Sequence, residues 1–336
     1  MIKPHTKILS KLRGILSIKN TAQIIMSNNT LQNQYKGCLV GLAVGDALGM
    51  PFEFWKREDV IQCLKVTTLD MNIKTNREMP AGFYTDDTSL MLCLAASLVE
   101  KGFDLEDQFK KYTNWLLKGY QTPFGYTYGV GQHTFKVLTR GKMRNTETLK
   151  GQGEYEGGNG TLMKTAPIGL YYQGNLDEIK NKSILSGYIT HNSLIASWTC
   201  VVLNSIISLI IDNKKDREDI LKYISNYFEN EIPEEVNVCL KLNYNALPSK
   251  PEEYSYPSSG YSLDSLRIAL WSWITTDDYP SSIRKVISLG NDTDTYAAIT
   301  GAITGCYYRY ESIPIEWKNC LMRENYIADI AEKLQK

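Results

Sequence analysis

Residues 35–48 read YKGCLVGLAVGDAL, and this stretch decides how the centre of the fold is built. Apolar residues recur at helical spacing along one face, at Leu39, Leu42, Ala43 and Ala47. The glycines recur at every fourth position, at Gly37, Gly41 and Gly45. Glycine at that spacing weakens an exposed helix but lets a second backbone pack closely. The segment is too short for a membrane dimer motif and contains a charged residue, Asp46. We therefore expect a helix in a crowded centre.

Helical patterns continue after this stretch. The spacing of apolar residues predicts helices over residues 88–100, 109–117, 193–211, 216–228, 262–275, 281–289 and 296–308. The first of these is expected to take its N-cap oxygen from Asp86, Asp87 or Thr88. Glycine, tyrosine and proline mark loops at 119–133, 150–160 and 245–260, and Pro167 limits the helix that can form over 162–172. Few strand-like alternations appear, so we predict a mainly α single domain.

Bulk composition excludes several classes of protein. The 336 residues hold 37 basic and 37 acidic side chains, so there is no overall basic field for nucleic acid or an anionic membrane. The seven cysteines form no Cys-x-x-Cys pair, which favours reduced, mostly buried thiols in the cytoplasm. We expect no apolar run to approach the roughly 18 residues of a membrane span. We expect a monomer with no membrane partner.

The first 30 residues differ from the rest, because they contain five lysine or arginine residues and no acidic ones. One interpretation is a basic organelle-targeting segment. The other, which we favour, is a mobile extension or an alternative start at Met26. We therefore assign residues 1–30 to an N-terminal extension and residues 31–336 to the folded domain.

Two clusters of acid and threonine side chains lie about 200 residues apart: Thr85-Asp86-Asp87-Thr88 and Asp292-Thr293-Asp294-Thr295. Taken alone, each reads as a helix start, because these residues cap N-termini and favour the helix dipole. Each, however, holds more acid than a cap needs. Carboxylates and hydroxyls are hard ligands that suit Mg²⁺, Mn²⁺ or Ca²⁺. If the two clusters face each other, they can hold two ions.

The second cluster also suggests a phosphatase of the haloacid dehalogenase type. Asp-x-Asp-x-Thr after a strand marks that class, and residues 286–290 would supply the strand. Two features oppose this alternative. The threonine directly follows the second aspartate, one place early, and little chain remains for the βα units such a fold needs.

Three other positions carry weaker signals. Gly158-Asn159-Gly160 reads either as a turn or as a loop whose backbone N–H groups approach a ligand. His191 is one of three histidines, and a lone histidine is usually structural. Glu53 by itself is only an acid in a turn.

Together these motifs resemble the ADP-ribosylglycohydrolase family, which includes the dinitrogenase reductase-activating glycohydrolase. The resemblance covers roughly residues 35–310 and rests on five segments in family order. They are Gly41–Gly49 with Pro51 and Glu53; Thr85–Thr88; Gly158–Gly160 with Met163 and Pro167–Leu170; Thr190-His191; and Leu289–Thr295 with Ala297-Ala298 and Gly301-Ala302.

The resemblance implies an all-α orthogonal multi-helix bundle with two Mg²⁺ or Mn²⁺ ions in a central dinuclear metal cleft. The implied metal ligands are Thr85, Asp86, Asp87, Asp292, Asp294 and Thr295. Gly158, Asn159, Gly160 and His191 would line the ADP-ribose cleft.

The implied reaction is hydrolysis of a glycosidic bond at the anomeric carbon of ADP-ribose, in a modified protein or a small conjugate. Asp87 or Glu53 would act as the base, with no choice made between them. Phe124, Tyr126 and Tyr128 either stack the adenine or are ordinary packing. A catalytically inactive ADP-ribose-binding relative is the alternative function.

Three positions depart from the family pattern. Lys164 stands where the family usually has arginine, and Asn291 stands where it often has a second glycine. Gly129 stands where the family has an acid near the leaving group, so this sequence does not by itself predict an arginine-linked substrate.

Overall fold

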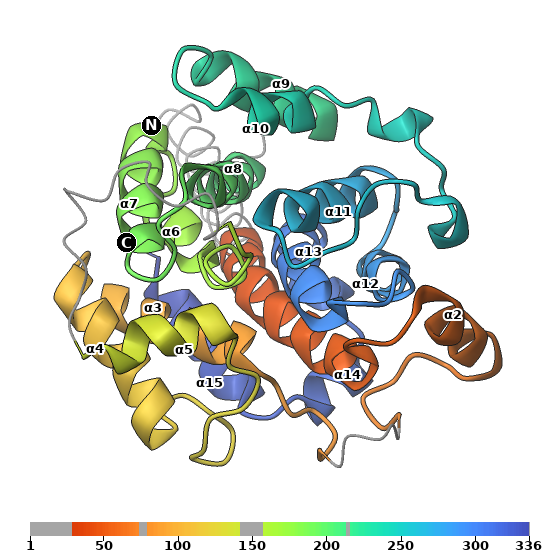
Figure 1. Ribbon diagram of the computed structural model, residues 1–336, viewed down its shortest axis with the longest axis horizontal. Coiled ribbons are helices and arrows are strands. Elements are labelled where there is room, and N and C mark those ends of the chain that lie inside the picture. The colour runs from red at the N-terminus through yellow and green to blue at the C-terminus, as the bar shows by residue number, and fades with distance from the viewer. Residues whose placement is uncertain (1–28, 74–78, 142–156, 213–215, 336) are drawn as a thin grey trace, which may run out of the picture.

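The computed structural model describes residues 29–73, 79–141, 157–212 and 216–335, and these residues form a helical bundle (Figure 1). A first helix occupies residues 29–49 and leads into a 3-10 turn, η1, at Met50–Phe52. The α-helices that follow are α2 (Arg57–Val66), α3 (Asp86–Lys101), α4 (Leu105–Lys118), α5 (Gln132–Thr139), α6 (Ala166–Tyr171), α7 (Leu176–Tyr188), α8 (Leu194–Ile211), α9 (Arg217–Tyr227), α10 (Glu234–Leu240), α11 (Ser262–Ile274), α12 (Tyr279–Ile287), α13 (Thr293–Tyr308), α14 (Ile315–Cys320) and α15 (Glu324–Lys333). Short 3-10 turns lie at η2 (Tyr244–Ala246), η3 (Pro251–Glu253) and η4 (Tyr310–Ser312). Within the described ranges, the one β-type pairing is an isolated bridge between Gly158 and Tyr261.

The predicted all-α fold is confirmed. Each helix predicted from apolar spacing is present, although several begin earlier than expected. For example, α12 begins at Tyr279 because the Asp278 carboxylate accepts a hydrogen bond from the Ser281 amide at 2.7 Å. The phosphatase alternative needed a strand at 286–290, but α12 extends to Ile287, so that interpretation is wrong.

The first helix packs against α13 along a ladder of small residues. A Cβ added to Gly37 would lie 2.1 Å from the Gly305 carbonyl oxygen. One added to Gly45 would lie 2.0 Å from that of Ala297, and one added to Gly49 would lie 2.4 Å from that of Thr293. Only glycine allows backbones this close. The crowded centre is therefore the contact between these two helices, and it brings the start of α13 beside the end of the first helix.

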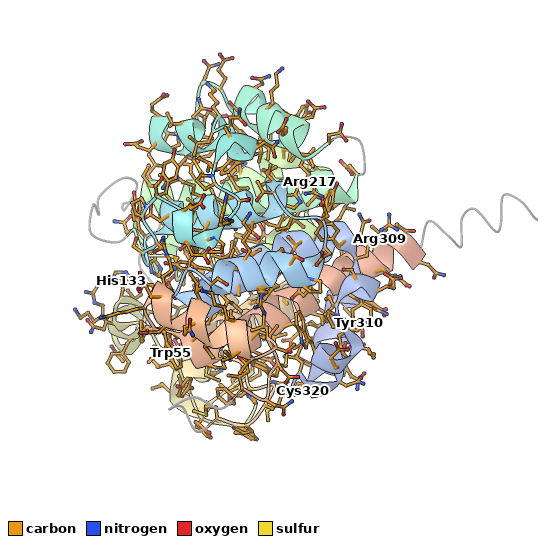
Figure 2. All side chains as sticks on the ribbon, turned by 90° about the vertical axis from the view of Figure 1, so that its right-hand side faces the viewer. Trp55, His133, Arg217, Arg309, Tyr310 and Cys320 are labelled. Atoms are coloured by element: carbon orange, nitrogen blue, oxygen red, sulfur yellow. The ribbon has the colours of Figure 1, made fainter. Side chains whose placement is uncertain are left out.

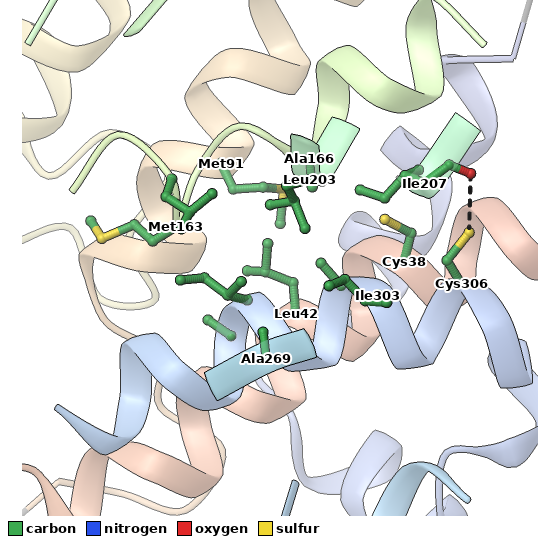
Figure 3. Close-up of a cluster of buried hydrophobic side chains, with 14 of the residues drawn as sticks. Cys38, Leu42, Met91, Met163, Ala166, Leu203, Ile207, Ala269, Ile303 and Cys306 are labelled. Atoms are coloured by element: carbon green, nitrogen blue, oxygen red, sulfur yellow. Dashed lines mark hydrogen bonds between the residues drawn. The ribbon is translucent and has the colours of Figure 1, made fainter. Parts of the chain in front are cut away.

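Side chains from several helices fill the space beside this ladder (Figure 3). Leu42 of the first helix, Met91 of α3, Leu203 of α8 and Ile303 of α13 are all buried there. Burial of this apolar surface holds the starts of α3 and α13 in fixed positions.

Helix α8 corrects the expectation that no stretch is apolar and long enough for a membrane span. Its 18 residues have a mean hydropathy of 2.2, so it is long and apolar enough to cross a membrane. No other single helix among the described residues is. However, 89% of the window is buried inside the protein. The helix packs against α6, α7, α11 and α13, so its apolar surface forms part of the core.

Candidate metal-binding cleft

A cleft of about 720 Å³ opens where the starts of α3 and α13 meet. The two acidic clusters, far apart in the sequence, both contribute to its wall. The lining includes these candidate site residues: Glu53, Asp86, Asp87, Tyr128, Gly158, Asn159, Gly160, His191, Asp292, Asp294 and Thr295. Thr85 lies just behind the wall, buried at the N-cap of α3.

The N-terminus of α3 is held by Asp46, which sequence reasoning did not select. Its carboxylate accepts hydrogen bonds from the backbone amides of Thr85 and Thr88, each at 3.0 Å. It also accepts from their hydroxyls, at 2.9 and 2.6 Å. The predicted N-cap oxygen from Asp86, Asp87 or Thr88 is therefore wrong. Because the cap comes from another helix, the carboxylates of Asp86 and Asp87 are not needed for it.

The carboxylates of the two clusters repel one another. Burial, and then the charge of neighbouring carboxylates, raise the pKa of Asp86, Asp87 and Asp294 well above the usual range. Burial also raises the pKa of Asp292, although hydrogen bonds oppose the shift, the largest from Asn159. Within the described residues, no lysine or arginine forms an ion pair with these four aspartates. The cleft therefore concentrates negative charge, and the buried Lys164 ammonium interacts with the charges of Asp86 and Asp87 through space.

The donor set fits a divalent cation. Carboxylate oxygens of Asp46, Asp87 and Asp294 lie within 4.8 Å of one another. Asp87 Oδ1 is buried and has no hydrogen-bond partner in the described part of the chain. Buried polar atoms are nearly always paired, so an oxygen left unpaired needs an explanation. A hard cation would supply the missing partner, and the oxygens of Asp46 are already used by α3.

The Gly-Asn-Gly loop supports the second cluster. Asn159 donates its side-chain amide to Asp292 Oδ2 at 2.6 Å and to Ser265 Oγ at 2.9 Å. Its backbone N–H donates to the Gly260 carbonyl at 2.9 Å. That N–H is thus used within the protein, contrary to the expectation of a loop with its amides aimed at a ligand. Asn159 instead fixes the orientation of Asp292.

The turn that precedes α13 is hydrogen-bonded to the segment that follows Glu53. Asn291 has φ of 65°, a left-handed conformation that asparagine tolerates, so it can stand where the family often has glycine. Its amide donates to the Trp55 carbonyl at 2.8 Å, and its own carbonyl accepts from the Phe54 amide at 2.7 Å. Glu53 is half-buried on the cleft wall. Phe54 beside it is 73% exposed.

A pair of histidines forms another part of the wall. The rings of His133 and His191 have centroids 4.7 Å apart. Figure 2 shows His133 on the same side of the molecule as Trp55, away from Arg309. His133, which is not among the predicted site residues, is placed there by α5. Two histidines that meet only in space give no signal in the sequence.

The structure shows what surrounds Lys164 and Gly129, two positions that depart from the family pattern. Lys164 is buried behind the loop instead of facing the cleft, and its ammonium donates to the Gly160 carbonyl at 2.6 Å. Gly129 has φ of 82°, and a Cβ added there would lie 2.7 Å from Asp86 Oδ1. A side chain at position 129 would therefore press on the first acidic cluster.

Of the three aromatic side chains for which adenine stacking and ordinary packing were both left open, Tyr128 lines the cleft. Phe124 stacks on Phe83 and Tyr126, with ring centroids 5.8 and 6.2 Å apart. Neither Phe124 nor Tyr126 is among the lining residues, and they are 48% and 50% exposed, so both lie outside the cleft wall.

Comparison with known proteins gives consistent matches. The family model for ADP-ribosylglycohydrolase matches residues 27–336. The chain is 29% identical to an ADP-ribosylarginine hydrolase of Serratia proteamaculans, over 94% of this chain and 82% of the relative. It is 26% identical to the ADP-ribosyl-[dinitrogen reductase] glycohydrolase of Rhodospirillum rubrum, over 87% and 91% of the two chains. It is also 26% identical to an ADP-ribosylhydrolase of Homo sapiens, over 85% and 88%.

A solved structure described as an ADP-ribosylglycohydrolase-related protein complex superposes with a TM-score of 0.73 and 27% identity. The match covers 91% of this chain and 98% of that one, so the whole bundle has the same architecture.

Proposed function

The chain belongs to the ADP-ribosylglycohydrolase family, and on this premise we propose that it hydrolyses the glycosidic bond at the anomeric carbon of ADP-ribose. The substrate is an ADP-ribosylated protein or a small ADP-ribose conjugate, and residues 31–336 form the catalytic domain. The observation that carries the proposal is the meeting of two acidic clusters, about 200 residues apart, in one cleft.

Two Mg²⁺ or Mn²⁺ ions are the proposed cofactors. Their ligands would be Thr85, Asp86, Asp87, Asp292, Asp294 and Thr295. When bound, such ions orient sugar hydroxyls and acidify water. Two observations support cation binding: Asp87 Oδ1 has no hydrogen-bond partner among the described residues, and the acids repel one another.

Glu53 is the proposed general base. It lines the cleft but stays half-exposed, so its carboxylate can accept a proton from water and return it to solvent. Asp87 is fully buried among Asp46, Asp86 and Asp292. That environment suits a metal ligand better than a group that must release protons repeatedly. The attacking water forms a bond to the anomeric carbon and gives a proton to Glu53, while the acceptor leaves with the electron pair of the broken bond and takes up a proton from solvent.

The acidic wall also favours the transition state. Positive charge develops on the sugar ring during glycoside cleavage. Carboxylates placed beforehand at that position stabilise the charge without reorganising. Gly158, Gly160, His191 and Tyr128 also line the cleft and are the proposed contacts to ADP-ribose.

The proposal is tested by ADP-ribose release from arginine-, serine- and nucleic-acid-linked substrates, each with Mg²⁺ or with EDTA. The wild type is compared with Asp86→Ala and Asp294→Ala. Release that needs the metal and is lost in both variants supports the hydrolase and identifies the linkage. If no substrate is cleaved while ADP-ribose still binds, the chain is a binding protein of the same family and the proposal is wrong.

A further inference from the structure

Lys164 lies at the centre of a hydrogen-bonded chain that ends at His191. Its ammonium donates to the Gly160 carbonyl at 2.6 Å and to Thr190 Oγ1 at 2.9 Å. It also lies 5.5 Å from the centroid of the Tyr112 ring, in cation–π contact, and its charge interacts with Asp86 and Asp87. Lys164 is 1% exposed, and it therefore has no direct contact with solvent in the cleft.

Thr190 connects Lys164 to His191 through its hydroxyl group. The Thr190 hydroxyl is fully buried, and its oxygen lies 3.0 Å from His191 Nδ1. A hydroxyl has one hydrogen to donate. Since the Thr190 oxygen already accepts from Lys164, its hydrogen needs an acceptor. Within the described chain, His191 Nδ1 is the one acceptor in hydrogen-bond contact with it.

The consequence is a defined tautomer. If Nδ1 accepts from Thr190, a neutral imidazole must hold its hydrogen on Nε2. The opposite tautomer would leave the buried Thr190 hydroxyl without an acceptor, which is costly.

The Nε2 edge of the ring lies against the glycine loop. A Cβ added to Gly160 would lie 3.2 Å from Nε2, and one added to Gly158 would lie 3.5 Å from it. Both glycines line the cleft with His191.

We propose that Lys164 is a positioning residue that, through Thr190, fixes His191 as the Nε2–H tautomer and so presents an N–H donor to a substrate oxygen in the cleft. The substrate part of this inference rests on the proposed function. The tautomer part does not, because it concerns the protein alone. Burial lowers the pKa of Lys164 to about 8, so the ammonium still predominates at pH 7.

The test is ¹⁵N NMR of the full chain labelled at histidine, without substrate. Nitrogen shifts distinguish the two neutral tautomers, and His191→Gln assigns the signal. His133 is an internal control: its Nε2 lies 2.8 Å from the Thr190 carbonyl, which can only accept, so its hydrogen must be on Nε2. Lys164→Met removes the donor, Lys164→Arg keeps one, and Thr190→Val removes the hydroxyl.

We expect one Nε2–H tautomer at His191 in the wild type and in Lys164→Arg, and a mixture in Lys164→Met and Thr190→Val. Loss of one neutral hydrogen bond to substrate should raise KM by about 3- to 10-fold in Lys164→Met, with a smaller change in kcat. An Nδ1–H signal in the wild type, or an unchanged Nε2–H signal in Lys164→Met, overturns the inference. Correct tautomers with no ADP-ribose binding in any variant would overturn the substrate part.

Discussion

Gly45→Ala tests whether the glycine ladder builds the site as well as the fold. The new Cβ would lie 2.0 Å from the Ala297 carbonyl oxygen and 2.5 Å from its carbon. The first distance is about 1.4 Å short of ordinary van der Waals contact. Backbone atoms cannot rotate away as a side chain can, so the first helix and α13 must separate by about 1 Å.

Two opposing contributions determine how much Gly45→Ala lowers the free energy of unfolding. Overpacking of a dense core costs about 1–3 kcal/mol, and sometimes more. Replacing glycine by alanine inside a helix stabilises the helix by about 1 kcal/mol. We expect the upper part of the range to apply, with a net loss of about 2 kcal/mol. The separation also moves Asp292 and Asp294 relative to Asp86 and Asp87, and a misplacement of 1 Å can cost about 100-fold in rate.

Gly37→Ala is the matched control. Its Cβ would lie 2.1 Å from the Gly305 carbonyl oxygen, so the clash is equivalent, but it occurs about 12 Å further along the helix from the cleft. Urea unfolding and kcat/KM are measured for both variants. We expect similar losses of stability and a much larger loss of activity for Gly45→Ala. Unchanged stability of Gly45→Ala, or equal losses of activity in the two variants, would refute the reasoning.

Other perturbations address the acids directly. Glu53→Gln should lower kcat by about 100-fold or more and leave Mn²⁺ affinity intact, whereas Asp87→Asn should lose both; calorimetry and kinetics separate the two, and full activity of Glu53→Gln would exclude it as the base. Burial raises the pKa of Asp46 to about 6, so the stability gained while it is protonated is lost as the pH rises through 6. In EDTA, Tm should therefore fall between pH 5 and pH 7, and a rise over that interval would contradict this. Asn159→Ala should weaken Mn²⁺ binding by about 10- to 100-fold, because Asp292 loses the amide that orients it; unchanged affinity would remove Asn159 from this role.

The sequence predicted the parts of this protein that depend on local spacing. The apolar face of residues 35–48 and the glycine repeat identified the central helix and its close contact. Long apolar runs identified α8 and α13. Helix α7 was not predicted, because its apolar residues do not gather on one face. In α7 a start signal was present, because Asn175 accepts a hydrogen bond from the Glu178 amide.

Contacts between distant segments were harder to predict. Asp46 is a single acid in a glycine-rich helix, and nothing in its neighbours indicates that it caps α3. His133 lies in an unremarkable stretch and reaches the cleft only because α5 places it there. Lys164 reads as a substitution for arginine, whereas its role depends on Thr190, 26 residues further on.

The central claim is that two acidic clusters form one divalent metal site. The most direct measurement is calorimetric titration of Mn²⁺ into the wild type, Asp86→Asn and Asp294→Asn, each first shown to be folded. The account predicts binding of two ions by the wild type and a severe loss of affinity in each variant, since both clusters supply ligands. Full Mn²⁺ affinity in either variant would contradict it, because one cluster alone would then be enough.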